Sequence, residues 1–207
     1  FQLTGAVQNL GFKTYSETRL ASATPWLINL LSDTDVEVDV CDSIAAPGFL
    51  EAGRLTQFDI SLAFPPFGVR YDSSLAERDR FERFPEITTS GSVLAVRHLI
   101  ARTKGRIVVA VTNGLLFSQG AERALRDDLL SKRMIEAVVS LPPALLPGTS
   151  IPFSLLILST SQPAEQIVFV DGCNPSLFTR DGKSRSTLTG WRDIASAVIT
   201  PHNSEIS

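Results

Sequence analysis

The sequence predicts an α/β fold in which helices cover a mainly parallel sheet. Short β-branched runs alternate with segments of helical periodicity along most of the 207 residues, and this alternation is typical of parallel strands joined by helical crossovers. The run from Arg106 to Thr112 is apolar throughout its interior, as expected of a parallel strand that is buried on both faces. A chain of this length has room for about one large domain, so we expect a single core.

The first part of the chain predicts strands and helices in alternation. The expected elements are a helix over 1–10, a strand over 12–15, a helix over 17–31, and strands over 36–40 and 58–63. Gly11 ends the first helix, and Pro25 interrupts the second, because proline removes a backbone donor and clashes with the preceding turn. The strand over 36–40 alternates apolar and acidic residues, a period typical of a half-buried strand.

The second part begins with a polar segment over 69–90, which is long enough to have a function of its own. Apolar residues then recur at helical or strand spacing. The expected elements are helices over 92–101 and 121–133, strands over 106–112, 135–140, 152–159 and 166–170, and one last helix within 188–198. From residue 173 the chain is polar and rich in Ser and Thr, so we expect one domain over 1–172 and a polar tail with one possible helix over 173–207.

The composition excludes several classes of protein. No apolar stretch approaches the roughly 20 residues that a membrane-spanning helix needs, so we expect a soluble protein with no membrane partner. Two cysteines are too few for a disulfide scaffold or a thiolate metal cluster, and they favour a reducing compartment. The net charge of −3 provides no overall basic surface, so binding to DNA would depend on a local basic patch or on a partner.

Common nucleotide-binding and metal-binding motifs are absent from the sequence. No Gly-x-Gly pair provides the fingerprint of a dinucleotide site. The segment over 48–53 has the glycine spacing of a phosphate-binding P-loop, but Arg54 and Leu55 stand where that loop needs lysine and a hydroxyl residue. Two histidines, His98 and His202, offer little to a histidine-based hydrolase or metal site. We therefore expect no bound metal, and a structural role for His98 within its predicted helix.

The most informative segment is Phe58 to Gly68, where a strand ends in two prolines followed by an aromatic residue. Pro65 and Pro66 cannot continue a strand ladder, so they end the strand at the carboxyl edge of the sheet, where α/β proteins bind ligands. This segment resembles the Asn-Pro-Pro-Phe motif of adenine-specific DNA methyltransferases. Three further segments resemble, in order and spacing, the modification subunits of type I restriction systems: 105–117, 141–158 and 168–171. Taken alone, the two prolines would indicate no more than the end of a strand.

The resemblance implies methyl transfer from S-adenosylmethionine to the exocyclic amine of adenine in DNA. In the family, the asparagine side chain and the carbonyl of the first proline accept hydrogen bonds from that amine, while the aromatic residue stacks on a base flipped out of the duplex. The corresponding catalytic segment here is Phe64, Pro65, Pro66 and Phe67. Phe64 has no acceptor where the family has asparagine. Because loss of one preorganised hydrogen-bonding group costs about 2 to 4 kcal/mol, we expect slow or absent catalysis by this chain alone.

The same resemblance implies residues that bind S-adenosylmethionine. Asp42 and Ser43, which follow the strand over 36–40, resemble a Gly-Asp-Ser segment whose acid accepts a hydrogen bond from the adenine of the cofactor. Glu17 stands where the family has an acid that holds the two ribose hydroxyls. Two local interpretations stay open, namely Glu17 as an acid at a helix N-terminus and Asp42 as a residue that caps a turn.

The family also has a Gly-rich segment, a first strand followed by a loop, which would precede Phe1. The resemblance therefore implies an S-adenosylmethionine-dependent methyltransferase-like sheet, with helices on both faces, that lacks its usual first strand. The domain over 1–172 would then be an N-terminally incomplete catalytic domain. DNA and the specificity and restriction subunits of a type I system are the implied partners, and the cytoplasm is the implied location.

Two other functions stay open at this point. A catalytically inactive methyltransferase relic would keep the fold as a scaffold that binds protein or DNA, and a different α/β nucleotide binder would hold phosphate at a helix N-terminus. The segment over 69–90 mixes aromatic residues with arginines that could contact DNA: Arg70, Arg78, Arg80 and Arg83. Its acidic residues nearly balance these charges, which favours a solvated loop.

Overall fold

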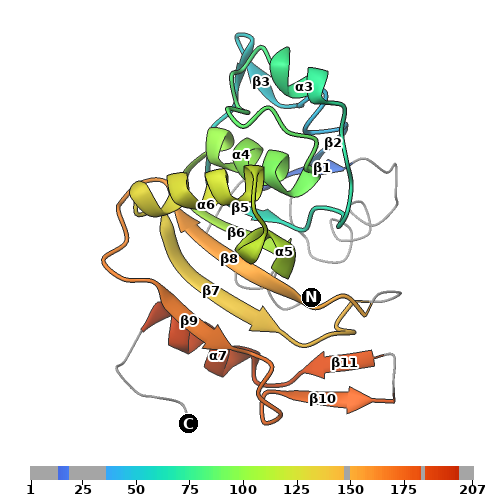
Figure 1. Ribbon diagram of the computed structural model, residues 1–207, viewed down its shortest axis with the longest axis vertical. Coiled ribbons are helices and arrows are strands. Elements are labelled where there is room, and N and C mark those ends of the chain that lie inside the picture. Colours follow the sequence, from blue (N-terminus) through green and yellow to red (C-terminus); the bar gives the residue numbers. More distant parts are fainter. Residues whose placement is uncertain (1–13, 19–35, 147–149, 183–184, 201–207) are drawn as a thin grey trace. The chain divides into compact units, whose positions relative to one another are not determined.

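The computed structural model describes residues 14–18, 36–146, 150–182 and 185–200 (Figure 1). The chain divides into two compact units, Phe1–Thr56 and Gln57–Ser207, and each is described by itself. The predicted helix over 1–10 and most of the one over 17–31 lie outside the described residues. Among the residues that are described, no helix has both the length and the apolar character needed to span a membrane.

The first unit contains a pair of parallel strands and a short hairpin. Its elements are β1 (Thr14–Thr18), β2 (Val36–Val40), β3 (Leu50–Glu51) and β4 (Arg54–Leu55). β1 and β2 are parallel, with Glu17 opposite Asp39. Glu17 therefore lies within a strand and does not begin a helix, which corrects the predicted start of the helix at Glu17, because pairing with β2 keeps the backbone extended to Thr18.

The hairpin of β3 and β4 explains the glycine spacing over 48–53. Leu50 pairs with Leu55 and Glu51 with Arg54, so Ala52 and Gly53 form the two-residue turn between the strands. Both turn residues have positive φ, 49° and 78°, as favoured in tight hairpins. The segment is therefore a hairpin and not a phosphate-binding loop.

The second unit is built on a five-stranded sheet with the order β5-β6-β8-β7-β9. The elements of this unit are β5 (Phe58–Ala63), α3 (Ser73–Glu77), α4 (Gly91–Arg102), β6 (Thr103–Thr112), α5 (Asn113–Phe117), α6 (Ala121–Ser131), β7 (Ile135–Leu141), β8 (Phe153–Ser159), β9 (Val168–Asp171), β10 (Phe178–Asp181), β11 (Arg185–Leu188) and α7 (Trp191–Ile199). β5 is parallel to β6 and β7 to β9, whereas β8 is antiparallel to both of its neighbours. Four strands of this sheet therefore point the same way, which confirms the predicted mainly parallel α/β fold.

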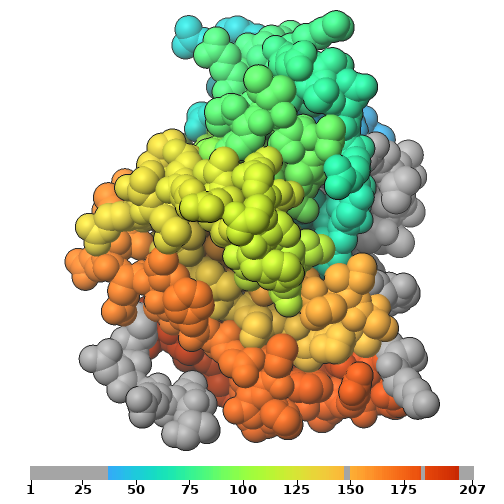
Figure 2. Space-filling view, viewed as in Figure 1, coloured from blue at the N-terminus to red at the C-terminus, as the bar shows by residue number. Residues whose placement is uncertain are grey.

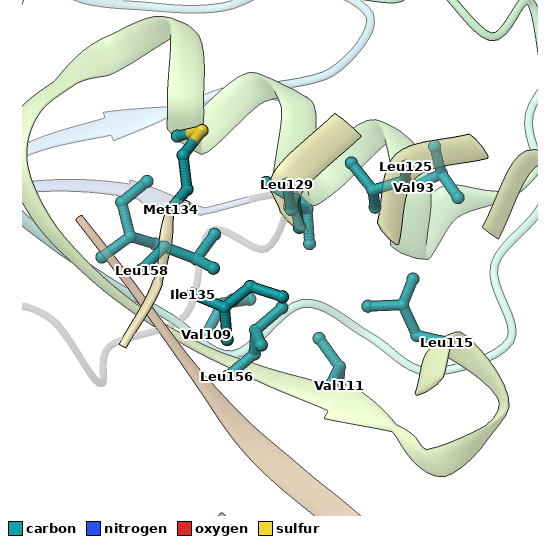
Figure 3. Packing of buried hydrophobic residues seen from close by; sticks show 12 residues of the cluster. Val93, Val109, Val111, Leu115, Leu125, Leu129, Met134, Ile135, Leu156 and Leu158 are labelled. Carbon is teal, nitrogen blue, oxygen red and sulfur yellow. The ribbon is translucent and has the colours of Figure 1, made fainter. Parts of the chain in front are cut away.

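Helices cover both faces of this sheet. On one face, α4, α5 and α6 pack over β6, β7 and β8, and their buried side chains form one apolar core (Figure 3). Figure 2 shows α5 and α6, coloured yellow-green to yellow, on the outside of this face. On the opposite face, Ile194 of α7 packs with Ala137 and Val139 of β7. Because Val109 belongs to the first core and Ala110 to the second, β6 is buried on both faces, as its apolar sequence predicts.

The segment over 69–90 is packed against α4, which corrects its interpretation as a solvated loop. The Arg83 guanidinium pairs with the Asp79 carboxylate at 2.8 Å, and its Nη1 lies 2.7 Å from Nδ1 of His98 on α4. Arg83, Phe84 and His98 are each at most 5% exposed. A buried charge needs such partners, so Arg83 and His98 hold the segment in place, and Arg83 is not available for a contact with DNA.

Candidate functional site

The double proline directly follows β5. The strand ends at Ala63, the chain from Phe64 to Pro66 has no regular secondary structure, and Phe67 and Gly68 form a turn. Gly68 has a φ of 73°, a conformation that glycine adopts without a steric cost. Since β5 runs parallel to β6, this segment lies at the carboxyl edge of the five-stranded sheet, where α/β folds bind ligands.

Three phenylalanine rings pack together at this edge. The Phe64 ring lies 5.6 Å from the Phe67 ring and 5.3 Å from the Phe153 ring, edge-on to the latter, and the rings of Phe67 and Phe153 are 5.7 Å apart. These centroid distances are within the range of favourable aromatic pairs. Phe153, the first residue of β8, is 4% exposed, whereas Phe64 is 51% exposed. Phe64 thus supplies a ring contact that fixes Phe67, and its side chain offers no hydrogen-bond acceptor.

An open pocket of about 250 Å³ lies beside Phe67. Its apolar lining residues are Phe67, Val69 and Ile151, and its polar lining residues are Arg70, Ser90, Ser92 and Thr112. Of the described residues, none with an acidic side chain lines it. The pocket therefore combines an aromatic ring, three hydroxyl groups and one positive charge.

Backbone pairing between two distant segments forms one wall of this pocket. Arg70 and Ser90 form an isolated antiparallel β-bridge, and the Gly91 amide donates to the Val69 carbonyl at 3.0 Å. A Cβ on Gly91 would lie 2.5 Å from the Val69 oxygen, so only glycine allows this approach without a shift of the backbone. The bridge brings Ser90, which precedes α4, next to the residues that follow the double proline.

Sequence reasoning identified Phe67 but not the other side of the pocket. Thr112 ends the strand that neighbours β5, so its place at the same carboxyl edge could have been inferred from the predicted parallel sheet. Ser90 and Ser92 carry no such signal, because they reach the pocket through a β-bridge between segments about 20 residues apart. Ile151 precedes β8 and has no local pattern that links it to this edge.

The predicted cofactor residues lie in the first unit. β1 and β2 are parallel. Glu17 near the end of β1 and Asp42 after β2 therefore lie toward the same end of this strand pair. Oδ1 of Asp42 accepts hydrogen bonds from the amides of Ile44 and Ala45, at 3.1 and 3.2 Å. Asp42 therefore caps the turn formed by Ser43, Ile44 and Ala45. A carboxylate group at this end of parallel strands also fits the hydroxyl and amine donors of a nucleoside.

The described residues contain no group of three or more His, Cys, Asp or Glu side chains that could hold a metal ion. The chemistry available at the edge beyond β5 is thus that of a backbone carbonyl, an aromatic ring, hydroxyl groups and one guanidinium. Such groups bind and orient an aromatic, anionic molecule without forming a bond to it. A mainly parallel α/β sheet with such groups at its carboxyl edge belongs to the class of α/β proteins that bind ligands at this edge.

The family follows from comparison with known proteins. The model of the N-6 DNA Methylase family matches residues 5–199, and the chain belongs to this family. It is 26% identical over 137 residues to the type I restriction enzyme MpnII methylase subunit of Mycoplasma pneumoniae, a match that covers 61% of this chain and 25% of that protein. The resemblance to type I modification subunits is therefore confirmed.

Solved structures share the fold. The methyltransferase subunit of a type I restriction-modification system from Streptococcus thermophilus superposes with a TM-score of 0.78 at 20% identity, over 94% of this chain and 49% of that one. The type I restriction enzyme EcoKI M protein gives a TM-score of 0.59 at 16% identity, over 86% of this chain and 38% of that one. The chain thus spans half or less of the length of these relatives.

Proposed function

We propose that this chain is the adenine-specific DNA methyltransferase domain of a type I restriction-modification system. The family match over residues 5–199 carries this proposal, and the double proline at the carboxyl edge of a parallel strand supports it. Membership of the family favours this function over an inactive scaffold. Under this proposal, residues 1–172 form the catalytic domain, and residues 173–207 follow it as a polar segment with one helix.

The residues after β5 would orient the target adenine. The Pro65 carbonyl accepts a hydrogen bond from the exocyclic amine, Pro66 keeps the backbone in one conformation, and the Phe67 ring stacks on the flipped base. Phe64 replaces the second acceptor with a ring, so the amine is oriented by one contact instead of two. Because a missing preorganised hydrogen-bonding group costs roughly a hundredfold or more in rate, methyl transfer by this chain is slow.

Three residues of the first unit would bind the cofactor. Glu17 holds the ribose hydroxyls of the cofactor. Asp42 accepts a hydrogen bond from its adenine amine, and Ser43 follows Asp42 in the same segment. When bound, S-adenosylmethionine supplies the sulfonium methyl group. We further propose that the chain acts in the cytoplasm on DNA, together with specificity and restriction subunits.

Titration with S-adenosylmethionine and transfer of labelled methyl groups test this function. Wild-type protein is expected to give a saturable calorimetric isotherm and slow labelling of the exocyclic amine of adenine in mixed-sequence DNA. Asp42→Asn keeps an oxygen that caps the turn to Ile44 and Ala45 but removes the charge. We expect about tenfold weaker binding of the cofactor, since charge-assisted hydrogen bonds are roughly twice as strong as neutral ones.

Glu37→Gln is the matched control, because Glu37 is an exposed acid on β2 and the substitution removes the same charge. It is expected to leave the isotherm unchanged. Protein that binds no S-adenosylmethionine and transfers no label would contradict the proposed function. An equal loss in both variants would contradict the role of Asp42.

A further inference from the structure

Arg70 is a basic residue whose charge has no partner in the described part of the chain. It lines the pocket beside Phe67, and its Nη1 donates to Oγ1 of Thr89 at 2.9 Å. The described residues provide no carboxylate that forms an ion pair with it. A guanidinium has five N–H donors, so Arg70 retains both charge and donors for a ligand.

Its surroundings hold this guanidinium at the pocket. The β-bridge to Ser90 fixes the Arg70 backbone, and the bond to Thr89 directs the side chain. Arg83, in the same segment, is instead used internally by Asp79 and His98. Arg83 therefore has a structural role, whereas Arg70 is exposed and held in position for a ligand.

The other lining groups indicate what the pocket binds. Phe67 provides a ring on which a base can stack, and such stacking tolerates any base. Ser90, Ser92 and Thr112 provide hydroxyl groups, and the Ser90 side chain makes no capping bond to α4. The pocket volume of about 250 Å³ is below the roughly 300 to 1,000 Å³ of pockets for drug-sized ligands, so the pocket suits one base and not several.

We propose that this pocket holds one nucleotide of a DNA strand and that Arg70 contacts its phosphate. This inference rests on the proposed function, because it takes the stacked base to be the methylation target. It adds a residue that binds the backbone of the strand and anchors the flipped nucleotide. It also provides a local positive contact in a chain whose net charge is −3.

The salt dependence of DNA binding tests the phosphate contact. The probe is a labelled single-stranded oligodeoxyadenylate, whose bases need no unpairing, and the readout is fluorescence anisotropy over a series of KCl concentrations. Each phosphate contact to a single strand contributes about −0.7 to the slope of log K against log salt. Arg70→Ala is expected to make the slope less steep by about 0.7, and Arg70→Lys to restore it.

Arg192→Ala is the matched control. Arg192 is exposed on α7, outside the pocket, and its removal changes the net charge equally, so we expect the wild-type slope. Equal slopes for wild type, Arg70→Ala and Arg192→Ala would overturn the inference, as would a wild-type protein that does not bind the oligonucleotide.

Titration of the same variants with S-adenosylmethionine separates this inference from the proposed function. Arg70 is not among the residues proposed to hold the cofactor, so Arg70→Ala is expected to keep the wild-type isotherm, which also reports that it is folded. If wild type and Arg70→Ala both bind the cofactor while their salt slopes are equal, the phosphate contact alone is refuted. If wild type binds neither cofactor nor DNA, both proposals fail.

Discussion

Arg97 on α4 joins two carboxylates in the interior of the second unit. Its guanidinium contacts Glu86, and its Nη1 lies 2.6 Å from Oδ2 of Asp128. The side chains of Arg97 and Glu86 are 8% and 5% exposed. Burial by itself lowers the pKa of the Arg97 guanidinium, but hydrogen bonds to Glu86 and Asp128 outweigh it and raise that pKa. The cation is therefore fixed in place between the segment over 69–90 and α6.

Removal of this arginine leaves a buried carboxylate without its partner. We expect Arg97→Ala to lower the free energy of unfolding by about 3 to 5 kcal/mol, the usual cost of breaking a buried ion pair. Arg123→Ala on α6 breaks a pair whose side chains are 63% and 65% exposed, and it should cost less than about 1 kcal/mol. Urea denaturation of both variants measures the difference. Similar losses in the two would show that the Arg97 cluster adds no special stability.

Single helices and strands are predicted correctly where the residue pattern of the element itself is sufficient to identify it. The strands over 36–40 and 58–63 have the predicted bounds, because alternation delimits the first strand and the double proline marks the end of the second. Helices α4 and α6 also lie where helical spacing predicts them. Long periodic segments carry their own signal, so their type can be inferred without tertiary contacts.

Elements that are very short, or that form through contacts with distant residues, are not predicted from the sequence. α3 and α5 have five residues each, too short for a 3.6-residue period to be visible. β10 and β11 pair with each other mainly through polar residues, and their hairpin lies in the segment interpreted from the sequence as a polar tail. The pocket beside Phe67 could be predicted only in part for the same reason, since the bridge between Arg70 and Ser90 is a tertiary contact.

The first residue of α4 allows a test of that bridge. A methyl group on Gly91 would meet the Val69 carbonyl at 2.5 Å, so Gly91→Ala should push the two segments apart. We expect it to weaken oligodeoxyadenylate binding by about tenfold, equivalent to roughly 1.4 kcal/mol, and to lower the midpoint of thermal unfolding.

Gly114→Ala is the control for this substitution. Its Cβ would lie 3.7 Å from the nearest atoms, an ordinary contact, and alanine is a better helix former than glycine. We expect its thermal midpoint and DNA affinity to be equal to or above those of wild type. An unaffected Gly91→Ala variant would contradict the account of the bridge.

For the whole molecule, carboxylates paired with basic side chains predict a loss of stability in acid. Burial by itself raises the pKa of Asp128, but hydrogen bonds from Arg97 and Lys132 lower it overall. A carboxyl group with a lower pKa in the folded state stabilises the fold above its unfolded pKa, near 4. That contribution is lost as the pH falls through the lower folded value.

We therefore expect the free energy of unfolding to decrease as the pH falls below about 4. Asp128→Asn should flatten this part of the curve, whereas Asp127→Asn, at an adjacent carboxyl that is 65% exposed, should run parallel to wild type. Denaturation curves across a pH series measure both. A wild-type curve that is flat between pH 5 and 2 would contradict the role of Asp128.

The ring cluster at the end of β5 has a consequence for redesign. Phe64 is half exposed to solvent, and its ring also contacts Phe153, which is buried at the start of β8. Asparagine at this position would add an amide oxygen but would remove the ring that contacts Phe67 and Phe153. Under the proposed function, a gain of the second acceptor would thus come with a loss of the ring contacts that hold Phe67.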